Sequence, residues 1–244
     1  MLNAQVIYSY DFNGPDTSVS GVTVNPEGGS WVTGGGTIDQ NGSTAGTGGA
    51  VLPYSFGTGI YEHTADINTS MLGTTSTSLA AIYFTNSDPL AAGYVTNSVS
   101  PFATFALRGN GDFDMWAGEG TSGNVDGGNL SDYGYSVSTS TDRIGQLRLV
   151  LDTTATNWTL SAYYTPSSIG ASEFQIDLNG ASAGGDYTYS TNPAAFTGSG
   201  VMTSISTGDQ VFANYTLTSI PEPSFYAMLV GVGVMAVVYL RRRN

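Results

Sequence analysis

The sequence predicts an all-β protein, folded as an antiparallel β-sandwich of the jelly-roll type. Three observations favour this class. Apolar and polar residues alternate along many short segments, turn-forming Gly, Asn, Asp, Ser and Thr separate these segments, and no stretch of the body follows the 3.6-residue period of an amphipathic helix. A series of roughly ten or more short strands is typical of sandwiches and jelly rolls. The length of 244 residues fits one such domain with an appendage.

The clearest single strand covers residues 61–67. Tyr61, His63, Ala65 and Ile67 alternate there with polar residues, which predicts one buried and one polar face. The same pattern predicts further strands at residues 6–12, 79–84, 102–108, 113–117, 174–178 and 211–218.

Two hairpins are predicted from the spacing of the strands. The turn 109–112, Gly-Asn-Gly-Asp, separates two of the segments above and carries a strong hairpin signal. The polar turn 152–157 joins a second pair of strands, in which apolar residues recur at every other position. The apolar positions of this pair are Leu147, Leu149 and Leu151 before the turn and Trp158, Leu160, Ala162 and Tyr164 after it.

The charge of the chain excludes one large class of partners. All six basic residues are arginine, and three of them lie among the last four residues. Without these three, three arginines stand against 19 acidic residues, a net charge of −16. Binding to nucleic acid needs clustered Lys or Arg to displace counterions, so we expect no nucleic-acid partner. The chain also has no cysteine, which excludes disulfides, thiolate catalysis and cysteine-based zinc sites.

The last two dozen residues differ in composition from the body. Pro221 and Pro223 forbid regular strand pairing and predict an extended spacer after Ile220. Residues 225–240 are uncharged and mostly apolar, and as a helix they would span roughly 24 Å, close to the hydrocarbon thickness of a bilayer. Arginines occupy 241–243, and the positive-inside rule places them in the cytoplasm and the body outside it.

A buried core helix is the competing interpretation of this segment. It is disfavoured because a segment without a polar face, ended by three arginines, offers no amphipathic stripe for docking. We therefore predict two parts: an extracytoplasmic β-sandwich over residues 1–219, and a tail over residues 220–244 with a single transmembrane helix at 225–240.

The tail resembles the PEP-CTERM sorting signal of Gram-negative bacteria. The resemblance rests on three features in order: the Pro-Glu-Pro tripeptide, the apolar span and the terminal arginine cluster. It implies processing by an exosortase, a membrane-embedded enzyme related to cysteine transpeptidases, and an association with exopolysaccharide and biofilm matrix. The sorting-signal residues are then Pro221, Glu222, Pro223, Arg241, Arg242 and Arg243.

The body, if it lies outside the cytoplasm, needs an export signal. Residues 1–5 lead straight into a strand-like run, without a basic or an apolar region of a signal peptide before it. Leu2-Asn3-Ala4 before Gln5 nevertheless has the small-residue character of a cleavage site. We therefore expect a signal peptide upstream of this sequence.

The body resembles the concanavalin A-like and laminin-G-like sandwiches that are often found before such tails. The resemblance rests on residues 105–116, 147–152, 158–163 and 211–217, whose strand and turn patterns many β-sandwiches share. It implies two antiparallel sheets, and it is compatible with carbohydrate binding through exposed aromatic side chains.

The acidic residues do not form a recognisable catalytic set. Glycosidases of the laminarinase type carry Glu-x-Asp-x-x-Glu on one strand, and the chain lacks this pattern. In the nearest stretch, Asp112 and Asp114 share a face with Trp116, whereas Glu119 has the opposite parity and is expected in a turn. This set can bind a sugar, but a solvent-facing strand explains it equally well, so we predict no catalytic residue.

His63 is the only histidine, and no Gly-x-Ser-x-Gly elbow accompanies it. We expect it to be a packing residue. No cofactor is predicted. Calcium is the one ion that the residue types permit, because hard oxygen ligands occur in two expected loops. Turn chemistry alone also accounts for these residues, which are Asp126, Asn129 and Asp132 in one loop and Asn110, Asp112 and Asp114 in the other.

Together these features predict an exported, non-enzymatic protein of the cell surface or extracellular matrix. Its precursor is anchored in the inner membrane with the body outside the cytoplasm, and its partners are the membrane, an exosortase-type enzyme and polysaccharide. Two alternatives stay open. One is a divergent glycan-active enzyme on the same sandwich, and the other is a structural protein that keeps its anchor permanently.

Overall fold

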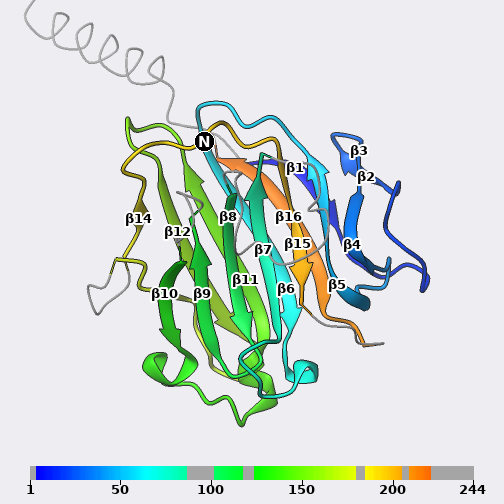
Figure 1. The fold of residues 1–244 in the computed structure, drawn as a ribbon, viewed down its shortest axis with the longest axis vertical. Helices are drawn as coiled ribbons and strands as arrows, with labels where there is room; N and C mark the ends of the chain where they lie inside the picture. Colours follow the sequence, from blue (N-terminus) through cyan, green and yellow to red (C-terminus); the bar gives the residue numbers. More distant parts are fainter. Residues whose placement is uncertain (1–3, 87–101, 118–123, 180–184, 205–208, 221–244) are drawn as a thin grey trace, which may run out of the picture.

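The computed structural model describes residues 4–86, 102–117, 124–179, 185–204 and 209–220. These residues form two antiparallel sheets that pack face to face, so that the sheets are seen one behind the other in Figure 1. The predicted all-β sandwich is therefore confirmed. The predicted helix 225–240 lies outside the described residues.

One sheet has nine strands, in the order β13-β12-β11-β6-β16-β1-β2-β3, and β14 also pairs with β12. Its strands are β1 (Gln5–Tyr10), β2 (Thr23–Pro26), β3 (Gly29–Ser30), β6 (Ile60–Asn68), β11 (Ile144–Asp152), β12 (Thr159–Pro166), β13 (Phe174–Gln175), β14 (Tyr187–Thr188) and β16 (Phe212–Ile220).

The other sheet has seven strands, in the order β10-β9-β8-β7-β15-β5-β4. Its strands are β4 (Val32–Ile38), β5 (Thr44–Pro53), β7 (Leu79–Thr85), β8 (Phe102–Arg108), β9 (Asp112–Trp116), β10 (Asn124–Asn129) and β15 (Gly198–Thr203).

The apolar core lies between the two sheets and follows the alternation seen in the sequence. In β6 and β11 every second residue is buried and its neighbours are half-buried. The 152–157 turn joins β11 to β12 as predicted, since Leu151 pairs with Leu160 and Leu147 with Tyr164. The turn between β8 and β9 is also confirmed, with the amide of Gly111 donating to the carbonyl of Arg108 over 3.0 Å.

Two predicted strands end two or more residues earlier than expected. The first was predicted to reach Phe12, but β1 stops at Tyr10 because Phe12 adopts a positive φ of 53° and turns its ring into the core. The strand predicted at residues 174–178 keeps only Phe174–Gln175, because the amide of Asp177 donates to the hydroxyl of Tyr133 and leaves the ladder with β12.

The glycine-rich strands β4, β5 and β15 were not predicted. Glycine has a low strand propensity, so residues 32–53 look like a loop. The structure shows why a strand forms there. A Cβ on Gly48 would lie 2.4 Å from the carbonyl oxygen of Gly36, and a Cβ on Gly200 would lie 2.0 Å from that of Ala50. Close contact between neighbouring backbones therefore requires glycine at these positions.

In the described connections lie three short 3₁₀ helices: η1 (Ser70–Leu72), η3 (Leu130–Tyr133) and η4 (Ser140–Arg143). They gather at one end of the sandwich, which is the lower end in Figure 1. Arg143 fixes this end, because one terminal nitrogen of its buried guanidinium donates to the carbonyl oxygens of Gly73 and Gly109 over 2.9 and 3.1 Å.

Candidate functional site

The outer face of the seven-stranded sheet carries a second apolar cluster, separate from the core. An antiparallel sheet in a sandwich usually turns one face to water. Here the apolar residues on that face are only 0–5% exposed, so little of their surface is open to solvent. We call these residues the outer apolar cluster: Val51, Leu79, Ala81, Tyr83, Ala106, Trp116 and Met202.

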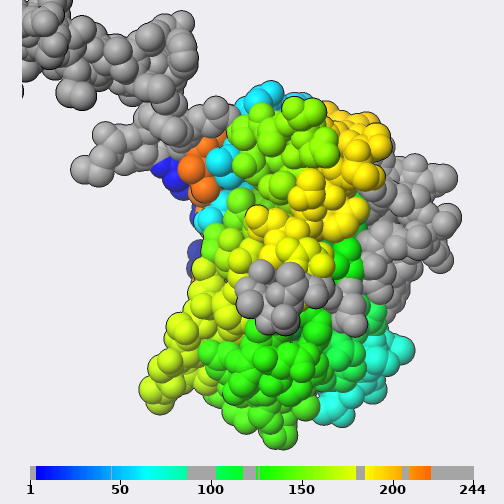
Figure 2. All heavy atoms as spheres, turned by 90° about the vertical axis from the view of Figure 1, so that its left-hand side faces the viewer, coloured from blue at the N-terminus to red at the C-terminus, as the bar shows by residue number. Residues whose placement is uncertain are grey.

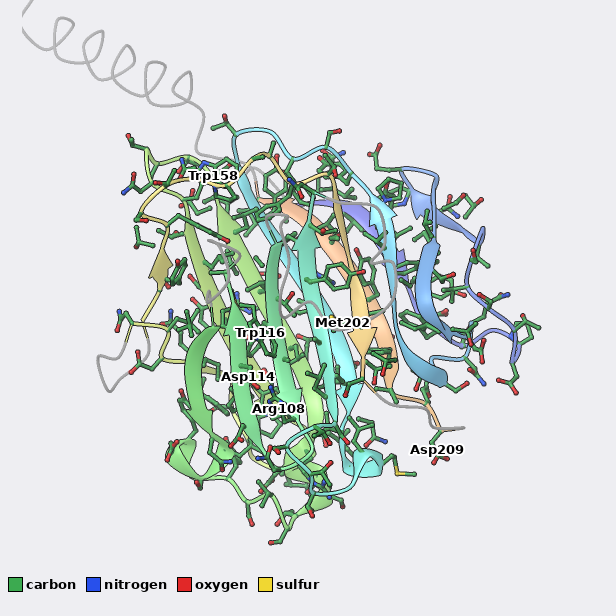
Figure 3. The ribbon with its side chains drawn as sticks, viewed as in Figure 1. Arg108, Asp114, Trp116, Trp158, Met202 and Asp209 are labelled. Carbon is green, nitrogen blue, oxygen red and sulfur yellow. The ribbon has the colours of Figure 1, made fainter. Side chains whose placement is uncertain are left out.

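Charged groups border the outer apolar cluster at β8 and β9. Arg108 forms an ion pair with Asp114, and both side chains are largely shielded from solvent, at 18% and 13% exposure. The same guanidinium donates to the carbonyl of Ser76 and lies 5.7 Å from the ring centre of Trp116. Figure 3 shows Arg108, Asp114 and Trp116 one above the other, with Met202 beside them on the same sheet.

A polar side chain without a partner lies in the middle of this face. Thr104 pairs across the strands with Tyr83 on one side and Trp116 on the other, so the three side chains form one row. Thr104 is fully buried, and its hydroxyl has no hydrogen-bond partner in the described part of the chain. The Tyr83 hydroxyl donates to the carbonyl of Ala50 over 3.2 Å, and burial raises the pKa of this phenol. An unsatisfied buried hydroxyl is costly, so Thr104 is an energetically unfavourable polar position in an otherwise apolar row.

The predicted grouping of Asp112, Asp114 and Trp116 on one face is confirmed, because the intervening residues of β9 point into the core. The two carboxylates nevertheless have different surroundings. Asp114 pairs with Arg108, whereas Asp112 accepts hydrogen bonds from the side-chain amides of Asn110 at 2.5 Å and Asn129 at 2.8 Å. The third acid considered with them, Glu119, lies outside the described residues.

One of the two loops considered for calcium is not a loop. Residues 124–129 form β10, in which Asp126 pairs with Asp114 and Asn129 with Asp112. Asn129 is also the N-cap of η3, where its backbone amide donates to the Asp132 carboxylate and its own side-chain oxygen accepts from the amide of Ser131, in a capping box. The side-chain oxygens of Asn129 and Asp132 therefore accept hydrogen bonds from backbone amides at the start of η3. Among the described residues, no group of three or more His, Asp or Glu side chains is placed to hold a metal ion.

His63 lies in the core, in agreement with its predicted packing role. It is fully buried and meets the rings of Tyr215 and Phe84, with ring centres 4.8 and 5.7 Å away. Neither ring nitrogen has a hydrogen-bond partner in the described part of the chain. Burial lowers the pKa of this imidazole to about 3, although the nearby backbone of Tyr83 counters part of the shift. His63 is therefore neutral at physiological pH.

A groove of about 370 Å³ lies at the lower end of the nine-stranded sheet, between β6, β16 and η1. Met71 and Ile144 supply apolar walls, and Asp66 and Asp209 supply carboxylates. Asp66 is already satisfied by the side-chain amides of Gln146 at 3.0 Å and Asn214 at 2.7 Å. This surface was not predicted, because it joins segments that are far apart in the sequence.

The outer apolar cluster was not predicted either, although the sequence contains a signal for it. Residues 79–84 are apolar at both parities, and β7 is buried on both faces. A continuous apolar run of this length indicates a strand covered on both sides. The partners of β7 on the outer face come from β5, β8, β9 and β15, and local patterns do not identify them.

The chain leaves the sandwich at Ile220, the last residue of β16. Ile220 pairs with Ile60 of β6, and Ser219 pairs with Gln5 of β1, so the strand stays within the sheet to its end. The predicted sorting residues 221–223 and 241–243 follow this point and lie outside the described residues. Within the described ranges, no helix is both long and apolar enough to cross a membrane.

The two sheets pack as an antiparallel β-sandwich. The C-terminal segment of the chain matches a known sequence motif. Residues 219–243 match the PEP-CTERM protein-sorting motif. The chain thus carries a PEP-CTERM sorting tail, which indicates an exported protein. No curated protein matches the chain.

Several solved structures are similar to the chain in fold. The VIP36 exoplasmic/lumenal domain in a Ca²⁺- and mannose-bound form is 11% identical, with a TM-score of 0.47, over 90% of this chain and 93% of that one. The Emp47p carbohydrate recognition domain is 12% identical, with a TM-score of 0.46, over 88% and 96%. A lectin from Bauhinia forficata in complex with GalNAc is 11% identical, with a TM-score of 0.44, over 89% and 99%. At these values the likeness concerns the fold alone.

Proposed function

We propose that this chain is a non-enzymatic protein of the cell surface or extracellular matrix, delivered there by its sorting tail. The observation that carries the proposal is the PEP-CTERM motif at 219–243, which begins within β16 and continues from it without an intervening linker. The motif supports an inner-membrane precursor with the body outside the cytoplasm and an exosortase-type enzyme as its processing partner.

We further propose that the body associates with polysaccharide at the outer face of the seven-stranded sheet. Sugar sites combine an aromatic face with groups that form planar or charge-assisted hydrogen bonds. Trp116 supplies the ring, Arg108 and Asp114 supply the charged groups beside it, and Thr104 offers an unused hydroxyl. No described aromatic side chain is exposed, and Trp116 is only 5% exposed, so sugar contact with its ring would require this face to open.

The processing step is tested in cells that carry an exosortase. The chain with Pro221, Glu222 and Pro223 all replaced by Ala is expected to keep its tail, because the recognised tripeptide is gone. Intact-mass measurement of the body then finds residues 241–243 still attached, whereas the unaltered chain has lost them. Their retention in the unaltered chain would instead support the permanently anchored structural protein.

The polysaccharide association is tested on a glycan array with Trp116→Ala against Trp158→Ala. Both changes remove a tryptophan, but Trp158 lies at the upper end of the sandwich, far from Arg108 (Figure 3). Only Trp116→Ala is expected to lower binding, by roughly ten-fold or more for the loss of about 1.5 kcal/mol of ring contact. Circular dichroism of both variants checks the fold. Equal binding by all three proteins would remove the proposed surface.

The non-enzymatic proposal rests on the engagement of the two candidate carboxylates. Asp114 is paired with an arginine and Asp112 with two amides, so both carboxylates are engaged in contacts within the protein. Incubation of the bound glycans with the protein, followed by chromatography, is expected to return them uncleaved. Cleavage that is abolished by Asp114→Asn would establish the glycan-active enzyme instead.

A further inference from the structure

The tail leaves the sandwich from the middle of a sheet. β16 is the fifth strand of the path β13-β12-β11-β6-β16-β1-β2-β3, and its last residue, Ile220, is held in the ladder by Ile60. Only residues 221–224 separate it from the predicted span that starts at Phe225. Five backbone steps reach at most about 18 Å. If the span inserts in a bilayer, the body is therefore held close to the membrane surface by a short and central tether.

In the described part of the chain, three connections lie around the point of exit, and none of them carries a charge. They are residues 54–59 between β5 and β6, residues 153–158 between β11 and β12, and residues 189–197 between β14 and β15. The strand registers place all three at the same end as Ile220, since Ile60 pairs with Asp152 and Asp152 with Thr159. We call this surface the exit end. It is the upper end in Figure 3, where Trp158 is labelled.

Hydrogen bonds join the three connections of the exit end into one platform. The backbone amide of Trp158 donates to Oδ1 of Asn192 at 2.8 Å, and Nδ2 of the same side chain donates to the carbonyl of Thr156 at 2.6 Å. The hydroxyl of Thr153 donates to the carbonyl of Gly57 at 2.9 Å. Figure 2 shows the lime and yellow atoms of 153–158 and 189–197 together at the top of the molecule.

The carboxylates gather at the opposite end. This asymmetry matters because the chain is strongly acidic, with 19 acidic residues against six arginines. Among the described residues, the nearest acid at the exit end is Asp152, whose carboxylate accepts hydrogen bonds from the amide and hydroxyl of Thr154, and Glu27 lies in the β2–β3 turn. The opposite end carries Asp16, Asp39, Asp112, Asp132, Asp142 and Asp209.

We propose that the exit end is a membrane-facing surface, which lies against the lipid bilayer while the precursor is anchored. This inference rests on the anchoring in the proposed function and adds the orientation of the body. Carboxylates within about one Debye length of anionic lipids are repelled, so the end with fewer described carboxylates is the one that tolerates this position. Trp158 and Tyr54 are half-buried there, and these residue types favour the membrane interface.

The other orientation that the tether allows is less favourable. The body would then lie flat on the outer face of the nine-stranded sheet, with β16 parallel to the membrane. That face presents the carboxylates of Glu62, Asp66 and Glu173 against a single arginine, Arg148. The charge of this face therefore opposes contact with anionic lipids, whereas the three described connections of the exit end offer only uncharged groups.

The absence of cysteine makes a site-specific test simple. The full chain is reconstituted into vesicles of phosphatidylethanolamine and phosphatidylglycerol that contain a headgroup-linked quencher, and single cysteines carry a fluorophore. Exposed positions are used: Ala194→Cys at the exit end and Ser138→Cys at the opposite end. Quenching is expected to be several-fold stronger at position 194. Equal quenching at the two positions overturns the inference.

Two further variants separate this result from the anchoring itself. A label at Ser224→Cys reports whether the tail inserts. Without quenching there, the anchoring in the proposed function fails, and the inference fails with it. Quenching at position 224 together with equal values at 194 and 138 overturns the orientation alone. A flexible Gly/Ser insertion between Ile220 and Pro221 lengthens the tether and is expected to abolish the difference between the two ends.

Discussion

His63 shows how much a single residue depends on its surroundings in this fold. Its ring packs between Tyr215 of β16 and Phe84 of β7, and the neighbouring Tyr215 hydroxyl shares a 2.6 Å hydrogen bond with the hydroxyl of Ser199. The imidazole itself has no partner in the described part of the chain, so its charged form is excluded from the core.

This burial makes stability depend on pH. The pKa of His63 falls from an ordinary value of 6.5 to about 3 in the folded protein. Between these values the unfolded chain binds a proton at His63 that the folded chain does not. The contribution of His63 to the free energy of unfolding is therefore fully present above pH 6.5 and decreases as the pH falls. The slope is about 1.4 kcal/mol per pH unit, or roughly 2 kcal/mol between pH 6.5 and 5.

His63→Phe is expected to remove this slope, because phenylalanine fills the same aromatic site without titrating. Urea unfolding of both proteins between pH 7 and 5 measures the difference in slope, in which the contributions of the other acids cancel. A parallel decline of the two curves would show that His63 is not the group responsible.

At the scale of elements, one arginine joins three strands on the outer face of the nine-stranded sheet. Arg148 of β11 pairs with Glu62 of β6 at 3.1 Å and binds Glu173, next to β13, through two nitrogens at 2.8 and 2.5 Å. Its guanidinium also stacks 3.8 Å from the ring centre of Tyr163 on β12. The planar fork of arginine suits this arrangement, and the point charge of lysine does not.

Arg148→Lys is therefore expected to lower the free energy of unfolding by about 1 kcal/mol. The value is modest because the side chains of Arg148, Glu62 and Glu173 are all partly exposed. Urea denaturation measures the loss, and Glu173→Gln in the Arg148→Lys background should cost less than in the unaltered protein. Full additivity of the two changes would show that the pair contributes nothing.

On the scale of the whole molecule, the sorting motif begins within the last strand of the sandwich. β16 lies between β6 and β1, so it completes the nine-stranded sheet and is not an edge strand. Processing at or beyond Pro221 therefore leaves the sandwich intact, whereas removal of even a few residues before it breaks the ladders on both sides of β16.

A chain that ends at Ile220 is accordingly expected to fold, and one that ends at Leu217 is expected to be much less stable. The shorter chain loses the pairing of Thr218, Ser219 and Ile220 with β6 and the pairing of Ser219 and Thr218 with β1. Thermal unfolding of the two proteins measures the difference. Similar melting temperatures would show that the end of β16 is dispensable for the sandwich.

Strands with strict alternation were predictable because their burial is decided by neighbours two residues apart. The buried sides of β6 and β11 were assigned correctly on this basis. Register irregularities were not predictable. A bulge between Val6 and Tyr8 places Ile7 and Tyr8 both in the core, and another occurs at Asn214, which adopts a positive φ of 48°. Such shifts arise from the partner strand.

The candidate site was predictable only in part. Asp112, Asp114 and Trp116 were placed on one face because period-2 geometry within a single strand dictates it. Arg108 and Thr104 joined them only through the pairing of β8 with β9, and Met202 through that of β15 with β7. These contacts are fixed by the order of strands in the sheet, which local sequence does not contain.

The sequence by itself determined the fold class, the inward face of the regular strands and the sorting tail. Each of these depends on composition or on spacing along a short segment. The tertiary structure alone decided that glycine-rich segments pair as strands, that β7 is covered on both faces, and that three uncharged connections meet around Ile220. These features arise between residues that are distant in sequence, where close backbone contact and strand order, rather than local periodicity, set the free energy.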